Sequence, residues 1–329
     1  MIGRVRILLC LLLLALSFSH AAGAQDKVRA GFGSLASSHM VLLVAKEFGL
    51  FQKYNLDAEI VGHIPGAKSV VPLVSGDAQI IHTAGPPFVL GTLAGSDVIM
   101  FMGLVNTMPF YLIAHKEIIT PMQLKGKKLG VSTLGSSSDF ALRFGLSKLG
   151  LDPERDVTIL ALGDSAIRVS ALTNGTIQCG AYNLGEAMVL RQLGHRQLLD
   201  LALSGIEYQH TAVATTRSFL GRDRKTVGSY SRAIIDAIRQ MKSRKEDTLK
   251  IMAKYLRIGE RQVLEAQYEE NVNKLYLKKP YPTVTGVKTI LDTLAAKNEK
   301  AKLAKPEQFV EMGIVRELDE SGFIDNLYR

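Results

Sequence analysis

The residues best suited to do chemistry stand in the stretch GVSTLGSSSDFALRFGL, residues 130–146, where a glycine and three serines precede an apolar pattern with helical spacing. The first N–H groups of a helix have no partner within it, and the helix dipole adds a partial positive charge there. A helix start can therefore hold an anion without a cationic side chain. We expect Gly135, Ser136, Ser137 and Ser138 to bind a ligand.

The same residues also have a purely structural interpretation. Ser136 and Asp139 have the spacing of a capping box, in which two side chains satisfy the helix start. A cap uses only some of the donors, so capping and ligand binding are compatible. The carboxylate of Asp139 would repel an anion unless it turns away, and it could instead pair with an amine of a zwitterion. The sequence leaves both roles open.

Alternating strand and helix patterns must position these residues. Apolar runs at 27–33, 57–64 and 77–85 alternate with helical patterns, and a second series of strands follows at 128–133, 157–162 and 178–184. Such alternation predicts an α/β fold with mostly parallel sheets. Residues 73–79 match residues 172–178, because each segment joins a helix that ends on glycine to a buried strand. The match suggests that the chain has two duplicated lobes, one built from each series of strands.

A helical tail and two crossings complete the predicted architecture. From about residue 218 the strand signals stop, and we expect the helices that follow to bury their apolar faces on the first lobe. The chain then crosses between lobes near 104–112 and again near 208–217, and two adjacent extended crossings make a hinge. The predicted lobes are 25–108 with 213–329, and 109–212.

This architecture adds further candidate ligand residues. In open parallel sheets, ligands bind at the carboxyl ends of the strands. Candidates lie in the loops at these strand ends in both lobes and on the two crossings. They offer polar groups or a close approach of the backbone, but each could instead be a cap, turn or hinge residue. The candidates are Ser34, Ser37, Ser38, Thr83, Ala84, Gly85, Asn106, Asn183 and His210.

The N-terminal 24 residues predict export. Arg4 and Arg6 precede an apolar run at 7–16, and an A-x-A signal ends at Ala24, so a signal peptide cleaved after Ala24 and a periplasmic location are expected. A second apolar stretch, 98–114, is interrupted by polar residues and Pro109, which favours two buried strands over a membrane helix.

Charge and cysteine content narrow the class. The formal net charge is +9, but the basic residues after 216 alternate with acids, which indicates a solvated helix face rather than a nucleic-acid surface. Cleavage would leave Cys179 as the only cysteine, so no internal disulfide is expected. We expect the protein to be a monomer that does not bind nucleic acid.

Enzyme motifs are weak or missing. Gly31, Gly33 and Ala36 have the spacing of a dinucleotide fingerprint, but the second strand lacks the required acid at its end. Neither G-x-S-x-G nor H-E-x-x-H occurs, and the histidines are scattered. We therefore expect no catalytic residue, cofactor or metal, while an enzyme built on a binding-protein fold remains an alternative.

Several segments resemble one family. VAKEFGLFQKYNLDAEIV, LVSGDAQIIHTAG, the segment 119–160 and VSALTNGTIQCGAYNLGEAMVLRQLG are similar to the nitrate, sulfonate and taurine type (NitT/TauT) of ABC-transporter solute-binding proteins, in the superfamily that includes thiamine-biosynthesis proteins. The resemblance implies a two-lobed, type II periplasmic binding fold that closes on a small ligand and delivers it to a membrane permease.

The resemblance has departures that bear on the ligand. Residues 183–186 replace the proline and the aromatic or acidic residue usual in the family, and the cysteine-rich stretch of the thiamine-pyrimidine relatives is missing. A small organic anion, sulfonate- or carboxylate-like, is thus the expected ligand. A receptor for another transporter type or a sensor is the remaining alternative.

Overall fold

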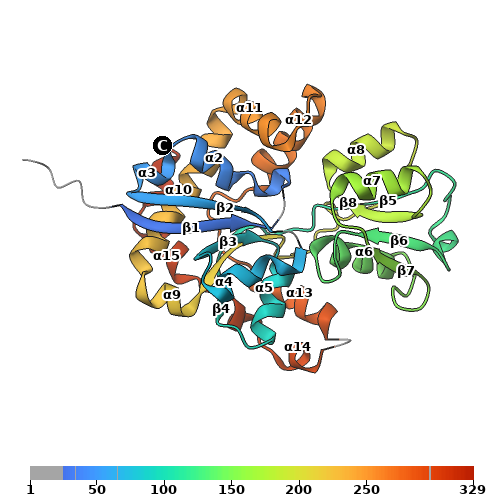
Figure 1. Cartoon of the computed structure of the whole chain (residues 1–329), viewed down its shortest axis with the longest axis horizontal. Helices are drawn as coiled ribbons and strands as arrows, with labels where there is room; N and C mark the ends of the chain where they lie inside the picture. The colour runs from blue at the N-terminus through green and yellow to red at the C-terminus, as the bar shows by residue number, and fades with distance from the viewer. Residues whose placement is uncertain (1–24, 34, 65, 296–297) are drawn as a thin grey trace, which may run out of the picture.

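The computed structural model describes residues 25–33, 35–64, 66–295 and 298–329. The predicted signal peptide and Ser34 lie outside these residues. The chain forms two α/β lobes, each with a five-stranded sheet (Figure 1). This confirms the predicted fold class.

The sheet of the first lobe is mainly built by the N-terminal part of the chain. Its order is β2-β1-β3-β10-β4, with β1 parallel to β2 and β3, and β10 antiparallel to β3 and β4. The strands are β1 (Asp26–Phe32), β2 (Leu56–His63), β3 (Ile80–Thr83), β4 (Val98–Val105) and β10 (Thr211–Thr216). The intervening helical segments are η2 (Ser37–His39), α2 (Val41–Glu47), α3 (Leu50–Lys53), η3 (Gly66–Val70), α4 (Val71–Ser75) and α5 (Gly85–Leu93).

The sheet of the second lobe has the corresponding order β7-β6-β8-β5-β9, with β6 parallel to β7 and β8, and β5 antiparallel to β8 and β9. Its strands are β5 (Tyr111–Ala114), β6 (Lys128–Val131), β7 (Thr158–Ala161), β8 (Cys179–Tyr182) and β9 (Arg196–Asp200). Its helical segments are η4 (Pro121–Leu124), α6 (Ser137–Lys148), α7 (Ser165–Thr173) and α8 (Leu184–Gln192). As predicted, the apolar stretch 98–114 contains two buried strands, β4 and β5.

The sequence repeat corresponds to a repeated hydrogen-bond pattern. In the first lobe Gln79 Oε1 accepts from Arg29 N at 2.8 Å, and in the second lobe Gln178 Oε1 accepts from Lys128 N at 3.2 Å. In both lobes the preceding helix ends at a glycine with positive φ, a conformation that glycine adopts without steric cost. The glutamine side chain thus ties the helix–strand turn to the neighbouring strand in each lobe.

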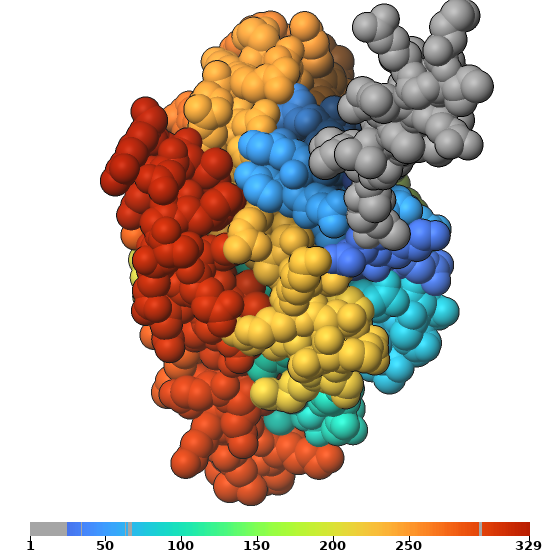
Figure 2. Space-filling model, turned by 90° about the vertical axis from the view of Figure 1, so that its left-hand side faces the viewer, coloured from blue at the N-terminus to red at the C-terminus, as the bar shows by residue number. Residues whose placement is uncertain are grey.

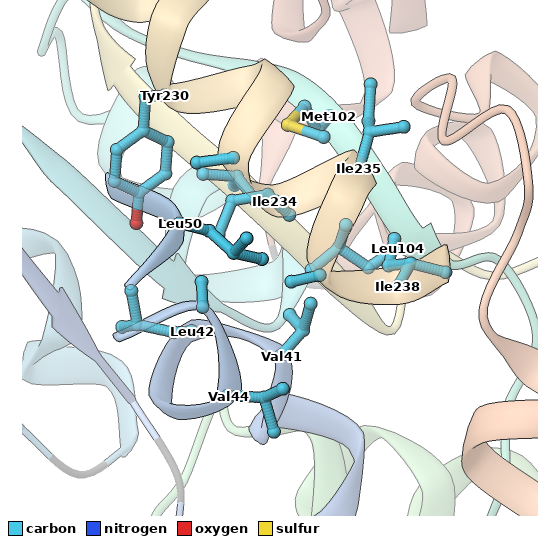
Figure 3. Packing of buried hydrophobic residues seen from close by; sticks show 14 of the residues in the cluster. Val41, Leu42, Val44, Leu50, Met102, Leu104, Tyr230, Ile234, Ile235 and Ile238 are labelled. Carbon is cyan, nitrogen blue, oxygen red and sulfur yellow. The ribbon is translucent and has the colours of Figure 1, made fainter. Parts of the chain in front are cut away.

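Much of the C-terminal helical tail packs on the first lobe. Helix α10 (Arg224–Ser243) lies against α2, and Figure 3 shows Ile234 and Ile238 beside Val41 and Leu50 in this core. Its apolar residues recur at helical spacing, so one face is buried while the other carries charges. Figure 2 shows the red C-terminal segments beside the yellow segment that includes α9.

The rest of the tail is almost entirely helical. Among the described residues after β10, the one strand-like contact is an isolated bridge between Val310 and Met100. The elements are α9 (Arg217–Arg222), α11 (Lys245–Leu256), α12 (Arg261–Tyr268), the π-helix η5 (Glu269–Leu275), α13 (Val284–Leu294), α14 (Glu299–Leu303), η6 (Pro306–Phe309), α15 (Gly313–Glu320) and α16 (Phe323–Leu327). None of the helices in the described ranges has the length and apolar character that a membrane crossing requires.

Two segments join the sheets, 106–110 between β4 and β5, and 201–210 between β9 and β10. The second lies earlier than the extended segment expected at 208–217, because most of that segment pairs as β10 in the first sheet. The crossings run side by side: Tyr208 N donates to Asn106 O at 3.1 Å, and His210 N donates to Val105 O at 3.0 Å.

Candidate ligand-binding site

The candidate residues gather where the lobes meet. The loops after β1 and β3 belong to the first lobe, and those after β6 and β8 belong to the second. A Cβ atom on Gly135 would lie 3.3 Å from Leu90 Cδ1, so the loop before α6 touches α5 of the other lobe. The carboxyl ends of the parallel strands therefore supply this junction from both sides.

A cluster of hydroxyls lies at the start of α6. Ser136 is the N-cap, and its Oγ accepts from Asp139 N. Ser132 Oγ lies 2.9 Å from Ser136 Oγ and 3.0 Å from Ser138 Oγ, and Ser138 Oγ also accepts from Ser132 N at 3.0 Å. The hydroxyls of Ser136 and Ser138 are therefore engaged in ordering the loop that they cap.

Asp139 is engaged in the same loop. Its Oδ2 accepts from Gly135 N at 2.9 Å, and its Oδ1 accepts from Arg143 Nε at 2.7 Å. Gly135 has a φ of +78°, which turns its N–H toward this carboxylate. Both carboxylate oxygens are thus used within the lobe, which favours the capping role of Asp139 over pairing with a ligand amine.

Ser137 differs from its neighbours. Its Oγ is buried and has no hydrogen-bond partner among the described residues, and the same holds for the hydroxyl of Tyr208 on the second crossing. Burial raises the pKa of Tyr208, and a side-chain hydrogen-bond interaction with Ser137 opposes this rise, so the two hydroxyls face each other. The Phe140 ring packs 5.6 Å from that of Tyr208. Two polar groups with bonding capacity therefore meet at this helix start.

The loop after β1 brings its serines to the junction with His39. Ser37 Oγ accepts from Asn271 Nδ2 at 2.9 Å, and Ser38 Oγ lies 3.1 Å from His39 Nδ1. The His39 ring meets that of His210 edge-on, with centroids 6.2 Å apart. The first-lobe loop with Ser37 and Ser38 and the second crossing with His210 thus come together, and their role in ligand binding stays a prediction.

His210 is neutral at this position. Burial, with His39 as the second cause, lowers the pKa of His210 to about 3, and its ring packs edge-on against Phe110 at 5.3 Å. Its Nδ1 is buried without a hydrogen-bond partner among the described residues. A neutral imidazole can offer a donor or an acceptor to a ligand, depending on its tautomer.

The loop after β3 is committed to packing. Thr83 Oγ1 accepts from Ser69 Oγ at 3.2 Å, and Ala84 is the N-cap of α5. Gly85 N donates to Gln209 O at 3.0 Å, so this N–H is used within the protein. Here the predicted residues lie at the junction, and their described hydrogen bonds fix the helix start to the second crossing.

The two asparagines also have internal partners. Asn106 Oδ1 accepts from Gln209 Nε2 at 2.9 Å, and Asn106 Nδ2 donates to Tyr281 O at 2.9 Å. Asn183 is the N-cap of α8, where its side chain accepts from Glu186 N at 3.1 Å and the Glu186 carboxylate accepts from Asn183 N at 2.8 Å. Both side chains, proposed for ligand contact, thus form hydrogen bonds within the protein that stabilise the crossing and the start of α8.

Sequence reasoning missed Tyr208 and a buried ion pair. Arg168 donates to Glu186 Oε1 at 2.9 Å, and both side chains are buried, so the arginine charge is balanced inside the second lobe. Ser165 also donates to Glu186. The described residues contain no group of three histidine, cysteine or acidic side chains placed to hold a metal ion.

These features define a class of protein. Two α/β lobes joined by paired crossings, with capped helix starts and uncommitted hydroxyls at their junction, form a type II periplasmic binding-protein fold. The chain belongs to the NMT1/THI5-like family, whose model matches residues 36–247. This confirms the resemblance to the nitrate, sulfonate and taurine type.

Individual relatives agree in fold. The binding protein YtlA of Bacillus subtilis (strain 168) is 23% identical over 231 residues, covering 68% of this chain and 69% of YtlA. The alkanesulfonate-binding protein SsuA of Xanthomonas axonopodis pv. citri, bound to MOPS, has a TM-score of 0.71 at 19% identity, covering 87% of this chain and 96% of SsuA. The periplasmic aliphatic sulphonate-binding protein SsuA of Escherichia coli gives 0.68 at 19%, covering 87% and 92%.

Proposed function

We propose that the chain is the periplasmic solute-binding component of an ABC importer and that it captures a small organic anion, sulfonate- or carboxylate-like, between its lobes. The proposal rests on the start of α6, where Ser137 Oγ and the Tyr208 hydroxyl are buried, face each other and have no other hydrogen-bond partner among the described residues. Free N–H groups at a helix start attract an anion, and these hydroxyls add donors at the same point.

The neighbouring charges are consistent with an anion held by neutral donors. Asp139 is paired with Arg143 and bonded to its own loop, and Arg168 is paired with Glu186. His210 has a pKa of about 3 because it is buried beside His39, so it is uncharged near neutral pH. Specificity would then come from the number and direction of the donors rather than from a salt bridge.

The transport role follows a hinge mechanism. Ligand contacts from both lobes favour the closed state, and a membrane permease recognises that state. The lobes in this mechanism are 25–108 with 213–329, and 109–212. The protein is exported, and cleavage after Ala24 removes its signal peptide. It acts as a monomer, and its partners are the ligand and the permease rather than nucleic acid. The two SsuA proteins of similar fold are sulfonate-binding proteins, which supports this ligand class.

A thermal-unfolding screen of residues 25–329 tests the proposal. The panel contains alkanesulfonates, aromatic and aliphatic carboxylates, nitrate, amino acids and pyrimidines. A ligand at about a thousandfold over its Kd adds roughly 4 kcal/mol, a shift of several degrees for a chain of this size. We expect an anionic class to give the largest shift.

Serine variants localise the effect. Ser137→Ala should reduce the ligand-induced shift, whereas Ser147→Ala should leave it unchanged, because Ser147 is exposed on the same helix and bonds to Arg143 O. A shift given only by amines or zwitterions, or no shift with any anion, would contradict the proposed ligand class.

A further inference from the structure

A contact between the lobes lies away from the helix starts. The Tyr111 hydroxyl, at the beginning of β5 in the second lobe, donates a 2.7 Å hydrogen bond to Glu270 Oε1 on the π-helix η5 of the C-terminal tail. Tyr111 is buried and Glu270 is partly buried. Shielding from water strengthens a hydrogen bond of this kind.

The same region of the tail makes a second contact with the other lobe. Helix α12 leads directly into η5, and its Gln267 lies against Gly185 in the first turn of α8. A Cβ atom on Gly185 would come within 2.6 Å of Gln267 Nε2, so the glycine permits this close approach. The end of α12 and the start of η5 therefore face the second lobe over two elements, α8 and β5.

The next residue of the π-helix turns the other way. Asn271 Nδ2 donates to Ser37 Oγ at 2.9 Å, and Tyr276, directly after the π-helix, donates from its hydroxyl to Ser37 O at 3.2 Å. Consecutive residues of a helix point in different directions, so Glu270 and Asn271 address different lobes. Runs of π-helix are rare and are often found at functional sites.

We propose that η5 is a latch between the lobes: Glu270 holds the second lobe through Tyr111, while Asn271 positions the Ser37 loop of the first lobe. Both are positioning residues. Movement of the second lobe away from Glu270 would release the segment that holds the loop, so lobe closure and loop order are coupled. The inference rests on the hinge mechanism proposed above, but its tests need no ligand.

Charged groups from several elements surround the latch. Burial raises the pKa of Glu270, the Tyr111 hydrogen bond acts in the opposite direction, and Asp200 on β9 adds to the rise. Lys274 on η5 and Arg191 on α8 act to lower it. The Arg191 guanidinium also lies over the Tyr111 ring, 5.8 Å from its centroid. Charged residues of α8 and β9 thus lie near Glu270 beside its hydrogen bond to β5, which fits a contact between lobes rather than a local cap.

Distances between spin labels measure the latch directly. Arg155→Cys in the second lobe and Lys250→Cys in the first place labels on exposed side chains, and buried Cys179 remains in place. We expect the ligand-free protein to show a closed population, and Tyr111→Phe and Glu270→Ala each to lower the ratio of closed to open molecules about tenfold. Glu270→Gln keeps an acceptor oxygen and should retain most of the closed population.

The matched control is Tyr182→Phe. Tyr182 is also a buried tyrosine of the second lobe, but its hydroxyl donates to Arg168 O within that lobe, so its loss should leave the distances unchanged. The double variant Tyr111→Phe with Glu270→Ala should open the lobes no further than either single change. Distances in Tyr111→Phe that match the wild type, or a wild type with no closed population, would overturn the latch.

Hydrogen exchange tests the coupling. Asn271→Ala should speed amide exchange at residues 37–39 severalfold, and Tyr111→Phe should do the same from the other lobe, while Tyr182→Phe should not. Slow exchange at these amides in Tyr111→Phe would show that the loop is independent of the second lobe. Failure of the ligand screen with a positive result here would reject the proposed ligand and leave the latch in place.

Discussion

Gln209 on one crossing donates a 2.9 Å hydrogen bond from Nε2 to Oδ1 of Asn106 on the other. The side-chain oxygen of Gln209, Oε1, accepts from Thr283 N at 2.8 Å, and Asn106 Nδ2 donates to Tyr281 O. The two crossings are therefore joined to each other and to the tail by side chains.

Asn106→Ala tests this role of the asparagine. Gln209 Nε2, in a fully buried side chain, keeps its bond to Thr211 O but loses the Asn106 acceptor for its second hydrogen, which costs about 1–3 kcal/mol in the free energy of unfolding. Urea unfolding measures the loss. The control is Asn273→Ala, whose amide bonds to Glu269 on an exposed surface and whose removal should cost less than about 0.5 kcal/mol. Equal losses in both variants would contradict the structural role of Asn106.

Ser137 and Ser138 should separate stability from binding. Ser138 Oγ accepts from Ser132 N and contacts two further hydroxyls, so Ser138→Ala should lower the free energy of unfolding by about 1–2 kcal/mol. Ser137 Oγ has no partner among the described residues, so Ser137→Ala should change stability little and weaken ligand binding. Urea unfolding and titration of the best anion from the screen measure the two effects. The opposite pattern would move the ligand contact to Ser138.

Much of the fold could be predicted because it depends on local patterns. The alternation of strands and helices, the repeat at 73–79 and 172–178, and the helical tail all leave periodic signals that the structure reproduces. The Ser136 cap on Asp139 N was also visible as a spacing, although the Asp139 carboxylate accepts from Gly135 N and so does not complete the predicted capping box. These features involve residues near one another in the chain, and their physics acts at short range.

The committed and uncommitted polar groups of the site could not be separated in the same way. Ser136, Ser137 and Ser138 are identical in type, and which hydroxyls are used depends on the fold of the loop around Ser132 and on the approach of distant Tyr208 to Ser137. Tyr111 and Glu270 are 159 residues apart, and no local signal pairs them. Tertiary packing fixes these relationships, so they become visible only when the lobes and the tail are assembled.

Acid should destabilise the protein partly through buried histidines. Burial lowers the pKa of both His82 and His210 to about 3, with His39 as a second cause for each. In the unfolded chain each has a pKa near 6.5, so between about pH 6.5 and 3 the unfolded state binds more protons. This contribution to stability is present above about pH 6.5 and is lost as the pH falls.

The variant His210→Gln tests how much the protonation of His210 contributes to this pH dependence. Its free energy of unfolding should fall less steeply with decreasing pH than that of the wild type, by up to about 1.4 kcal/mol per pH unit. Urea midpoints between pH 7.5 and 4 give the two curves, and their difference removes the contribution of carboxylates common to both. Parallel curves would show that His210 becomes protonated in the folded state.

Gly85 should be intolerant of any side chain. A Cβ atom there would lie 2.6 Å from Gln209 O and 2.8 Å from Ile290 Cδ1, so Gly85→Ala must displace the backbone of the second crossing. Overpacking of this kind costs about 1–3 kcal/mol. Gly221→Ala is the matched control, because Gly221 lies in α9 with nothing within 4 Å of its Cβ position. Alanine there should add about 0.5–1 kcal/mol through helix propensity. Urea unfolding should thus give opposite signs for the two substitutions, and a gain in stability for Gly85→Ala would mean that α5 and the crossing are not in contact in solution.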